Sequence, residues 1–225
     1  MRKIKLNFKL LLLVFTPFLF TSCFEVIEDV TVNANGSGKV ALIVNLSQSK
    51  TKLKTIMLMD SINGYAVPSE ATIRKEFNNT VKTLKTIKGL TNIKQSLNFD
   101  DFIFKISCDF ATIENLNQVV SRFSEMNNMK VPNGLKHFSY NKATKTFIRN
   151  YKYDLTKAFN SAKKEDRKVL EDASYVTIYR FQHSIISSKN KMAKIAKNNK
   201  AILLKVKAQD IINNTNTIKN TIKLN

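Results

Sequence analysis

The sequence predicts an α+β fold: an antiparallel sheet built from successive β-hairpins with helices packed on one face, preceded by a cleaved signal peptide. Three observations lead to this prediction. Pairs of segments with apolar residues at every second position are joined by short polar turns, which is typical of hairpins. Segments with apolar residues at three- and four-residue steps follow them, as expected for amphipathic helices. The chain also opens with a basic and then apolar segment that ends at Cys23.

The first 22 residues have the layout of a secretory signal peptide. Basic residues precede an apolar stretch at residues 10–20, and the polar Thr21 and Ser22 lead to Cys23. The stretch is too short to span a bilayer, which takes about 20 apolar residues. Residues 1–22 are therefore predicted to be removed, leaving residues 23–225 as a single α+β envelope domain.

The segment Phe20-Thr21-Ser22-Cys23 resembles the lipobox of bacterial lipoproteins, with phenylalanine at the position where that family usually has leucine. The resemblance implies attachment of lipid to the Cys23 thiol, cleavage before Cys23 and acylation of the new amine. The alternative is a plain signal peptide that is cut near Ser22 and leaves Cys23 as a free thiol. Both alternatives export the protein.

The mature chain begins with a predicted hairpin. Residues 25–33 and 40–46 alternate between apolar and polar, and Asn35-Gly36-Ser37-Gly38 between them indicates a turn because Asn and Gly tolerate positive φ. Helices are predicted over residues 47–63 and from Pro68-Ser69-Glu70 to Gly89. Because the hairpin directly follows the signal peptide, a lipid anchor would hold the domain close to the membrane.

A second hairpin is predicted from residues 91–99 and 102–110, with its turn at Asp100-Asp101. A helix follows from about Thr112 to Met126, and Pro132-Asn133-Gly134 indicates a loop. The second strand of this hairpin carries five apolar residues on one face: Phe102, Phe104, Ile106, Cys108 and Phe110.

A third hairpin is predicted from residues 138–140 and 147–153, followed by a helix that Asp154 caps and that ends near Glu171. Residues 184–200 are compatible with either a helix or a loop. The chain closes with three predicted strands, at residues 175–181, 201–206 and 218–224.

No catalytic or metal-binding set of residues is recognisable, so the chain is predicted to be no enzyme and to need no cofactor. His137 and His183 lack the carboxylate or cysteine partners that a metal site requires. Cys108 shares its strand face with aromatic residues, and an apolar site makes a thiol inert. Adjacent acids such as Glu28-Asp29 point to opposite faces of a strand and do not converge. If Cys23 is lipidated, Cys108 has no disulfide partner.

The mature chain is strongly basic. The full chain carries a net charge of +20, and loss of the four basic residues of the signal peptide leaves +16. An exported protein meets anionic headgroups and envelope polyanions, so no nucleic-acid partner is expected. A Lys/Asn-rich composition is equally compatible with a solvated basic surface that has no partner.

The C-terminal third is the strongest candidate for an interaction surface. Residues 184–225 contain nine Lys and one Asp, and a lysine beside an anionic leaflet contributes about 1 kcal/mol. Residues 147–153, with Arg149 and Lys152, mimic a basic-aromatic binding strip, but their alternation indicates ordinary sheet residues. The candidate contacts with an anionic surface are Lys189, Lys191, Lys194, Lys197, Lys200, Lys205 and Lys207.

The whole chain resembles small Lys/Asn-rich lipoproteins of Bacteroidota, through the Phe20–Cys23 box, the turn at residues 35–38 and the strand Tyr175–Phe181. The strand, Gly-rich turn, strand and later aromatic strand also resemble the mycobacterial LppM-type lipoprotein domain. Neither family supplies catalytic residues.

These observations together predict a non-enzymatic envelope protein that binds or scaffolds at the membrane surface, with the outer membrane favoured over the inner. Its expected partners are the membrane, through lipid on Cys23, and an anionic lipid or an envelope protein. One alternative is an accessory lipoprotein subunit of a secretion or transport complex. Another is an envelope enzyme that uses Cys108 or a carboxylate.

Overall fold

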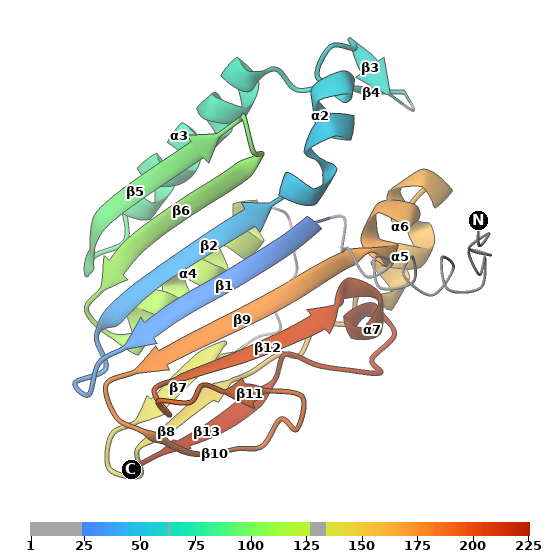
Figure 1. Cartoon of the computed structure of the whole chain (residues 1–225). Coiled ribbons are helices and arrows are strands. Elements are labelled where there is room, and N and C mark those ends of the chain that lie inside the picture. Colours follow the sequence, from blue (N-terminus) through green and yellow to red (C-terminus); the bar gives the residue numbers. More distant parts are fainter. Residues whose placement is uncertain (1–23, 63, 127–133) are drawn as a thin grey trace, which may run out of the picture.

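The computed structural model describes residues 24–62, 64–126 and 134–225, which form a large sheet with a second layer behind it (Figure 1). The large sheet has seven strands. They are β1 (Phe24–Val32), β2 (Gly38–Asn45), β5 (Leu90–Asn98), β6 (Ile103–Phe110), β9 (Ala173–Phe181), β11 (Lys194–Ile195) and β12 (Ala201–Lys207). Their order across the sheet is β11-β12-β9-β1-β2-β6-β5.

The second layer consists of a four-stranded sheet and helices. The strands are β7 (Phe138–Asn141), β8 (Thr146–Arg149), β10 (Ile185–Ser188) and β13 (Asn220–Leu224), in the order β10-β13-β8-β7. The helices of this layer are α3 (Glu70–Lys85), α4 (Ile113–Met126), α5 (Thr156–Ser161), α6 (Lys164–Glu171) and α7 (Ala208–Ile212). The short helices η1 (Ser47–Ser49) and α2 (Lys50–Ile56) follow β2 beyond the end of the sheet. A separate small hairpin joins β3 (Ser61–Ile62) to β4 (Tyr65–Ala66).

Strands β1 and β9 are neighbours that run parallel, with Val30 opposite Tyr179. The other neighbours in the two larger sheets pair antiparallel. Parallel strands need a long crossover connection. Here the crossover contains α3, α4 and the β7–β8 hairpin, so it supplies much of the layer that covers the sheet.

Among the described residues, helices and strands cover one face of the seven-stranded sheet, called here the inner face. Helices α3 and α4 pack over β6, where Leu84 and Val119 contact Ile106 and Cys108. The four-stranded sheet covers β1, β9 and β12. No helix or strand of the described residues crosses the opposite, outer face, which is turned toward the viewer in Figure 1.

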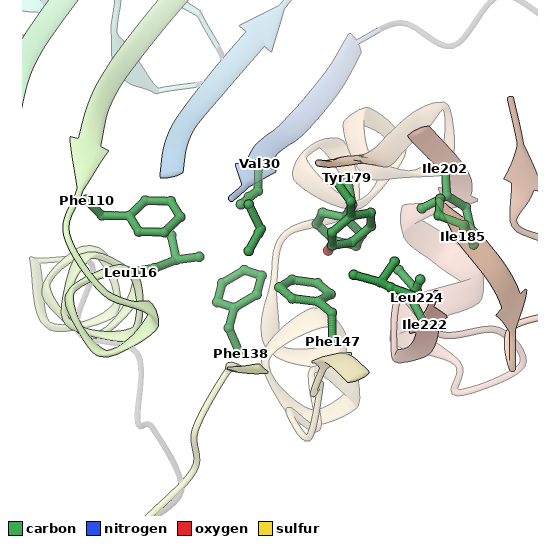
Figure 2. Packing of buried hydrophobic residues seen from close by; sticks show 12 residues of the cluster. Val30, Phe110, Leu116, Phe138, Phe147, Tyr179, Ile185, Ile202, Ile222 and Leu224 are labelled. Atoms are coloured by element: carbon green, nitrogen blue, oxygen red, sulfur yellow. The ribbon is translucent and has the colours of Figure 1, made fainter. Parts of the chain in front are cut away.

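The main core lies between the two sheets (Figure 2). Phe147 of β8 is fully buried, and its ring centroid lies 5.2 Å from that of Tyr179 and 5.9 Å from that of Phe138. Val30 and Ile222 approach the same rings from β1 and β13. Aromatic residues of this size bury large apolar areas, so this cluster holds the two layers together.

The predicted fold class is confirmed, since helices and an antiparallel-dominated sheet alternate along the chain as expected. The first turn places Gly36 at φ 83°, a conformation that glycine adopts without strain. Helix α3 begins after Ser69, whose hydroxyl accepts a hydrogen bond from the Thr72 N–H at 3.2 Å. The predicted loop at residues 132–134 lies outside the described residues except for Gly134.

Two predictions about sheet architecture were wrong. The third hairpin does not extend the first two but forms the second sheet with β10 and β13. The pairing of β1 with β9 is parallel, although the hairpins had indicated antiparallel pairs only. Both features depend on contacts between distant segments, which alternation within a segment cannot specify.

Several predicted element boundaries were also wrong. The helix predicted over residues 47–63 ends at Ile56, because α2 buries no residue and such a short helix is marginal without a packed face. The helix predicted from Asp154 to Glu171 is interrupted by the extended residues Ala162 and Lys163. Residues 184–200 contain β10 and β11, and the short helix α7 was not predicted.

Replacement of Phe147 by alanine tests the interlayer core. We expect Phe147→Ala to lower the free energy of unfolding by about 3–5 kcal/mol, because the cavity left behind lies among rings that cannot collapse into it. Leu58→Ala is the control, since Leu58 is 89% exposed and should change stability by no more than about 0.5 kcal/mol. If urea unfolding shows that both variants lose the same free energy of unfolding, this account of the core is contradicted.

Candidate functional site

Glu28 is a charged residue on the inner face of β1. It follows the same alternation as Val26 and Val30, so its side chain points between the two sheets, and it is only 6% exposed. An unpaired carboxylate in such a place would cost several kcal/mol. Its position therefore requires a cationic partner from the layer that covers it.

Arg149, at the end of β8, is that partner and is itself 4% exposed. Its Nε donates to Glu28 Oε1 at 2.9 Å and its Nη2 donates to Oε2 at 2.7 Å, a bidentate pair. The Tyr175 hydroxyl donates to Oε2 at 3.0 Å and the Tyr179 hydroxyl to Oε1 at 2.5 Å. Arg149 also donates to the Asn150 carbonyl at 2.6 Å and lies over the Phe138 ring.

Both members of this pair are charged at neutral pH. Burial raises the pKa of Glu28, but the charge of Arg149 and hydrogen bonds from Arg149, Tyr179 and Tyr175 outweigh it, so the pKa lies below its ordinary value. Burial lowers the pKa of Arg149, but the negative charge of Glu28 outweighs this effect, so the pKa lies above its ordinary value. The contact between the sheets at this point is therefore an ion pair, in which neither charge is left without a partner.

An apolar cavity of about 540 Å³ lies beside the Arg149 end of this network. Its walls come from the first residues of β1, from β2 and α4, and from the three short helices α5, α6 and α7. The interruption between α5 and α6 lets both helices contribute to the lining. Representative wall residues are Phe24, Leu42, Phe159, Leu170, Ile211 and Ile218.

A few polar groups interrupt the apolar lining. His137 is fully buried, and its Nε2 lies 3.3 Å from the Tyr153 hydroxyl. Its Nδ1 has no hydrogen-bond partner among the described residues. Burial, and then the charge of Arg149, lower the pKa of His137, so its ring is neutral. Burial raises the pKa of Tyr151 to about 12. The cavity thus presents neutral donors and acceptors on an apolar wall, which is typical of ligand sites.

The predicted site residues lie elsewhere. Cys23 is outside the described residues, so its lipidation stays a prediction. Lys194, Lys205 and Lys207 share the outer face of the large sheet, where Lys205 Nζ donates to Glu25 Oε1 at 2.5 Å. The other four lysines predicted to contact an anionic surface are exposed in the connections before and after β11. They are Lys189, Lys191, Lys197 and Lys200.

The predicted role of Cys108 as a core residue is consistent with the structure. Cys108 is 3% exposed, and burial, followed by the charge of Asp109, raises the pKa of its thiol to about 11.

His183 is half-buried. The described part of the chain contains no group of three metal-ligating side chains. Within the same residues, no helix has the length and hydropathy needed to cross a membrane.

Sequence reasoning missed the pair of Glu28 and Arg149 although a signal was present. Glu28 stands at an apolar position of the β1 alternation, and Arg149 occupies the same phase as Phe147 in β8. A charge at such a position must be paired. The prediction that residues 147–153 form one strand was wrong, because β8 ends at Arg149 and Tyr151 and Tyr153 line the cavity instead.

Comparison with known proteins gives a weak structural similarity. No family model matches the chain, and no curated protein matches it either. The structure is similar to the NMR structure of the folded domain of LppM from Mycobacterium tuberculosis, with a TM-score of 0.46 and 12% identity over 93% of each chain. A TM-score of this size does not establish a shared fold. The resemblance to Bacteroidota lipoproteins stays a prediction, and function is inferred from this chain's own residues.

Removal of the Glu28 charge tests the buried pair. We expect Glu28→Gln to lower the free energy of unfolding at pH 7 by about 3–5 kcal/mol, because Arg149 would remain buried and charged. Glu25→Gln, which breaks an exposed pair, should cost no more than about 1 kcal/mol.

The pH dependence of this difference provides a second measurement. Because the pKa of Glu28 is lowered on folding, its contribution is complete above the unfolded-state pKa of about 4.3 and disappears as pH falls through the folded-state pKa. The stability gap between wild type and Glu28→Gln should therefore shrink on acidification. A gap that widens as the pH falls would contradict the charged state of Glu28.

Proposed function

We propose that this protein is a non-enzymatic, lipid-anchored envelope lipoprotein that holds the apolar chain of an amphiphile in the cavity beside Arg149. The observation that carries the proposal is the cavity itself, with a volume of about 540 Å³ and walls of aliphatic and aromatic side chains. Ligand sites for small molecules typically measure about 300–1,000 Å³. Transfer of each CH₂ group from water into such a site contributes about 0.8 kcal/mol.

The position of the cavity in the chain supports this proposal. Phe24 lines the cavity and directly follows Cys23 in the sequence. A lipid on Cys23 would therefore tether the domain by the same strand that forms a wall of the cavity. Such an anchor keeps the cavity within reach of a bilayer, which is the source of acyl chains in the envelope.

Filling the cavity tests this function. We expect residues 24–225, which contain all three core clusters, to bind a fluorescent fatty acid such as cis-parinaric acid with a saturable increase in emission. Ala208→Phe and Ala162→Phe place a ring in the lining and should each weaken binding at least about tenfold, the effect of 1.4 kcal/mol. Ala71→Phe adds the same ring at an exposed site on α3 and should leave binding unchanged.

Two results would contradict the proposal. One is an absence of saturable binding to the wild-type protein. The other is equal binding by all the variants, provided that their unfolding curves show that each is folded. Equal binding by all the variants would mean that the probe binds at the surface and that the cavity holds no chain.

A second candidate function is docking of the outer face of the large sheet on an anionic membrane. One row of this face runs Lys205, Val176, Ile27, Ile43 and Lys105 across β12, β9, β1, β2 and β6. Apolar side chains thus occupy the centre of the row, where Val176 is buried and Ile27 and Ile43 are half-buried. Lysines stand at its two ends, and Lys205 is paired with Glu25. Lys194 and Lys207 add further positive charge on this face. An anionic leaflet complements this pattern, since lysine heads meet headgroups while apolar residues contact the interface.

A vesicle-binding experiment tests this docking. The triple variant Lys105→Gln/Lys194→Gln/Lys207→Gln should bind phosphatidylglycerol vesicles roughly 100-fold more weakly than wild type, at about 1 kcal/mol per lysine. Binding by the wild type should fall as salt rises. Lys52→Gln/Lys75→Gln/Lys85→Gln removes the same charge elsewhere and is the control. Binding that is insensitive to salt and to the outer-face variant would favour an accessory subunit that docks on a protein instead.

A further inference from the structure

A basic pocket of about 460 Å³ adjoins the apolar cavity. Three lysines line it, Lys136, Lys152 and Lys219, together with Asn150 and Tyr151. Tyr151 also belongs to the lining of the cavity. The two hollows therefore share a wall at Tyr151. The cavity on one side is apolar, and the pocket on the other side is cationic.

The chain passes from one hollow to the other within single residue steps. Lys136 lines the basic pocket and the next residue, His137, lines the cavity. Ile218 lines the cavity and the next residue, Lys219, lines the basic pocket. Lys152 follows Tyr151, which lines both. These segments therefore form the boundary between the two hollows, and a molecule that extended across this boundary would meet apolar groups on one side and lysines on the other.

The backbone of the basic pocket is held in place by asparagine side chains. Asn150 Nδ2 donates to the Lys136 carbonyl at 2.8 Å, and the Asn150 N–H donates to the His137 carbonyl at 2.8 Å. Asn190 Nδ2 donates to the Lys219 carbonyl at 3.0 Å. These bonds fix the segments next to β7 and β13 that carry Lys136 and Lys219, without engaging their ammonium groups.

The positive charge of the pocket is uncompensated within the described residues. None of the three lysines lies within salt-bridge distance of a carboxylate there. Asp154, two residues after Lys152, instead accepts a hydrogen bond at 3.0 Å from the N–H of Thr156, the first residue of α5. Three like charges around one hollow repel one another, and an anion bound among them would relieve that repulsion.

His137 supplies an independent observation that points to a ligand. It is fully buried in the cavity lining, and its Nδ1 has no hydrogen-bond partner in the described structure. A buried polar atom without a partner is costly. A hydroxyl or carbonyl of a ligand would reach this nitrogen only after a movement of the ring or of its neighbours, because its surface is covered in this structure.

We infer that the pocket formed by Lys136, Lys152 and Lys219 binds the anionic headgroup of the amphiphile whose chain occupies the cavity. The ligand class is an acyl chain that carries a phosphate or a carboxylate, with a polar group near His137. This inference rests on the proposed function, because it assigns the headgroup of a ligand whose tail the cavity must hold. The charge-assisted contacts of the headgroup add affinity and exclude neutral and cationic amphiphiles of the same chain length.

The test uses probes with one tail and different headgroups. Palmitoyl lysophosphatidate, palmitate, monopalmitoylglycerol and hexadecyltrimethylammonium are titrated as competitors of cis-parinaric acid on residues 24–225. We expect the two anions to bind at least roughly tenfold more tightly than the neutral glyceride in low salt, the effect of one to two charge-assisted contacts. The cation should bind most weakly.

Variants then assign the preference to the pocket. Lys136→Gln/Lys152→Gln/Lys219→Gln should abolish the preference for anions while leaving the affinity for monopalmitoylglycerol unchanged. The control Lys52→Gln/Lys75→Gln/Lys85→Gln makes the same change in net charge on α2 and α3 and should retain the preference. Inorganic phosphate alone should compete only weakly, because it lacks the tail.

The outcomes distinguish the two hypotheses. If the tail binds but anions have no advantage, or if the advantage survives in the lysine variant, the headgroup inference is wrong and the cavity function stands. If inorganic phosphate binds as tightly as lysophosphatidate, the pocket is a site for free phosphate and the inference is overturned. If none of the palmitoyl probes binds, both the proposed function and the headgroup site fail.

Discussion

A carboxylate on the covered face of a sheet restricts what can lie opposite it. Glu28 sits among valines on β1, so the second layer must bring a cation to that point and supply donors for both oxygens. Arg149 meets this requirement only when β8 is in its observed register, because a shift by one residue would turn its side chain to the other face. The bidentate bond thus fixes the position of the small sheet on the large one. The rings of Phe138, Phe147 and Tyr179, which meet in tilted and edge-to-face pairs, then pack around a contact whose geometry is already specified.

The same contact lies where strand β8 of the small sheet ends. Arg149 is the last residue of β8, and it lines the cavity as well as binding Glu28. Beyond it the chain leaves the sheet, and Tyr151 and Tyr153 turn toward the hollow that α5, α6 and α7 enclose. The large sheet is longer than the small one that covers it, so its inner face near Phe24 is roofed by short helices and loops rather than by strands.

The polar groups are distributed in a way that suits an amphiphile. Charges inside the cavity wall are neutralised, since Arg149 is paired and His137 is uncharged. Lysines without a carboxylate partner among the described residues stand outside that wall, around the adjoining pocket and, as Lys194 and Lys207, on the outer face of the sheet. An apolar chain can therefore be buried without desolvating a free charge, while an anionic group meets cations that remain hydrated.

The sequence by itself determined the elements whose signal is local. Alternation placed Cys108 with the aromatic residues of β6, and the Asn-Gly turn and the Ser69 cap positioned β1, β2 and α3, because each pattern depends on residues only a few positions apart. Only the tertiary structure decided the parallel β1–β9 pair, the second sheet, the bond between Glu28 and Arg149 across 121 residues of chain, and the cavity. These features arise from which segments meet, and many pairings of amphipathic strands bury their apolar faces equally well. The charge at an apolar position of β1 showed that a partner was required, but the identity of that partner depended on the packing of the two layers.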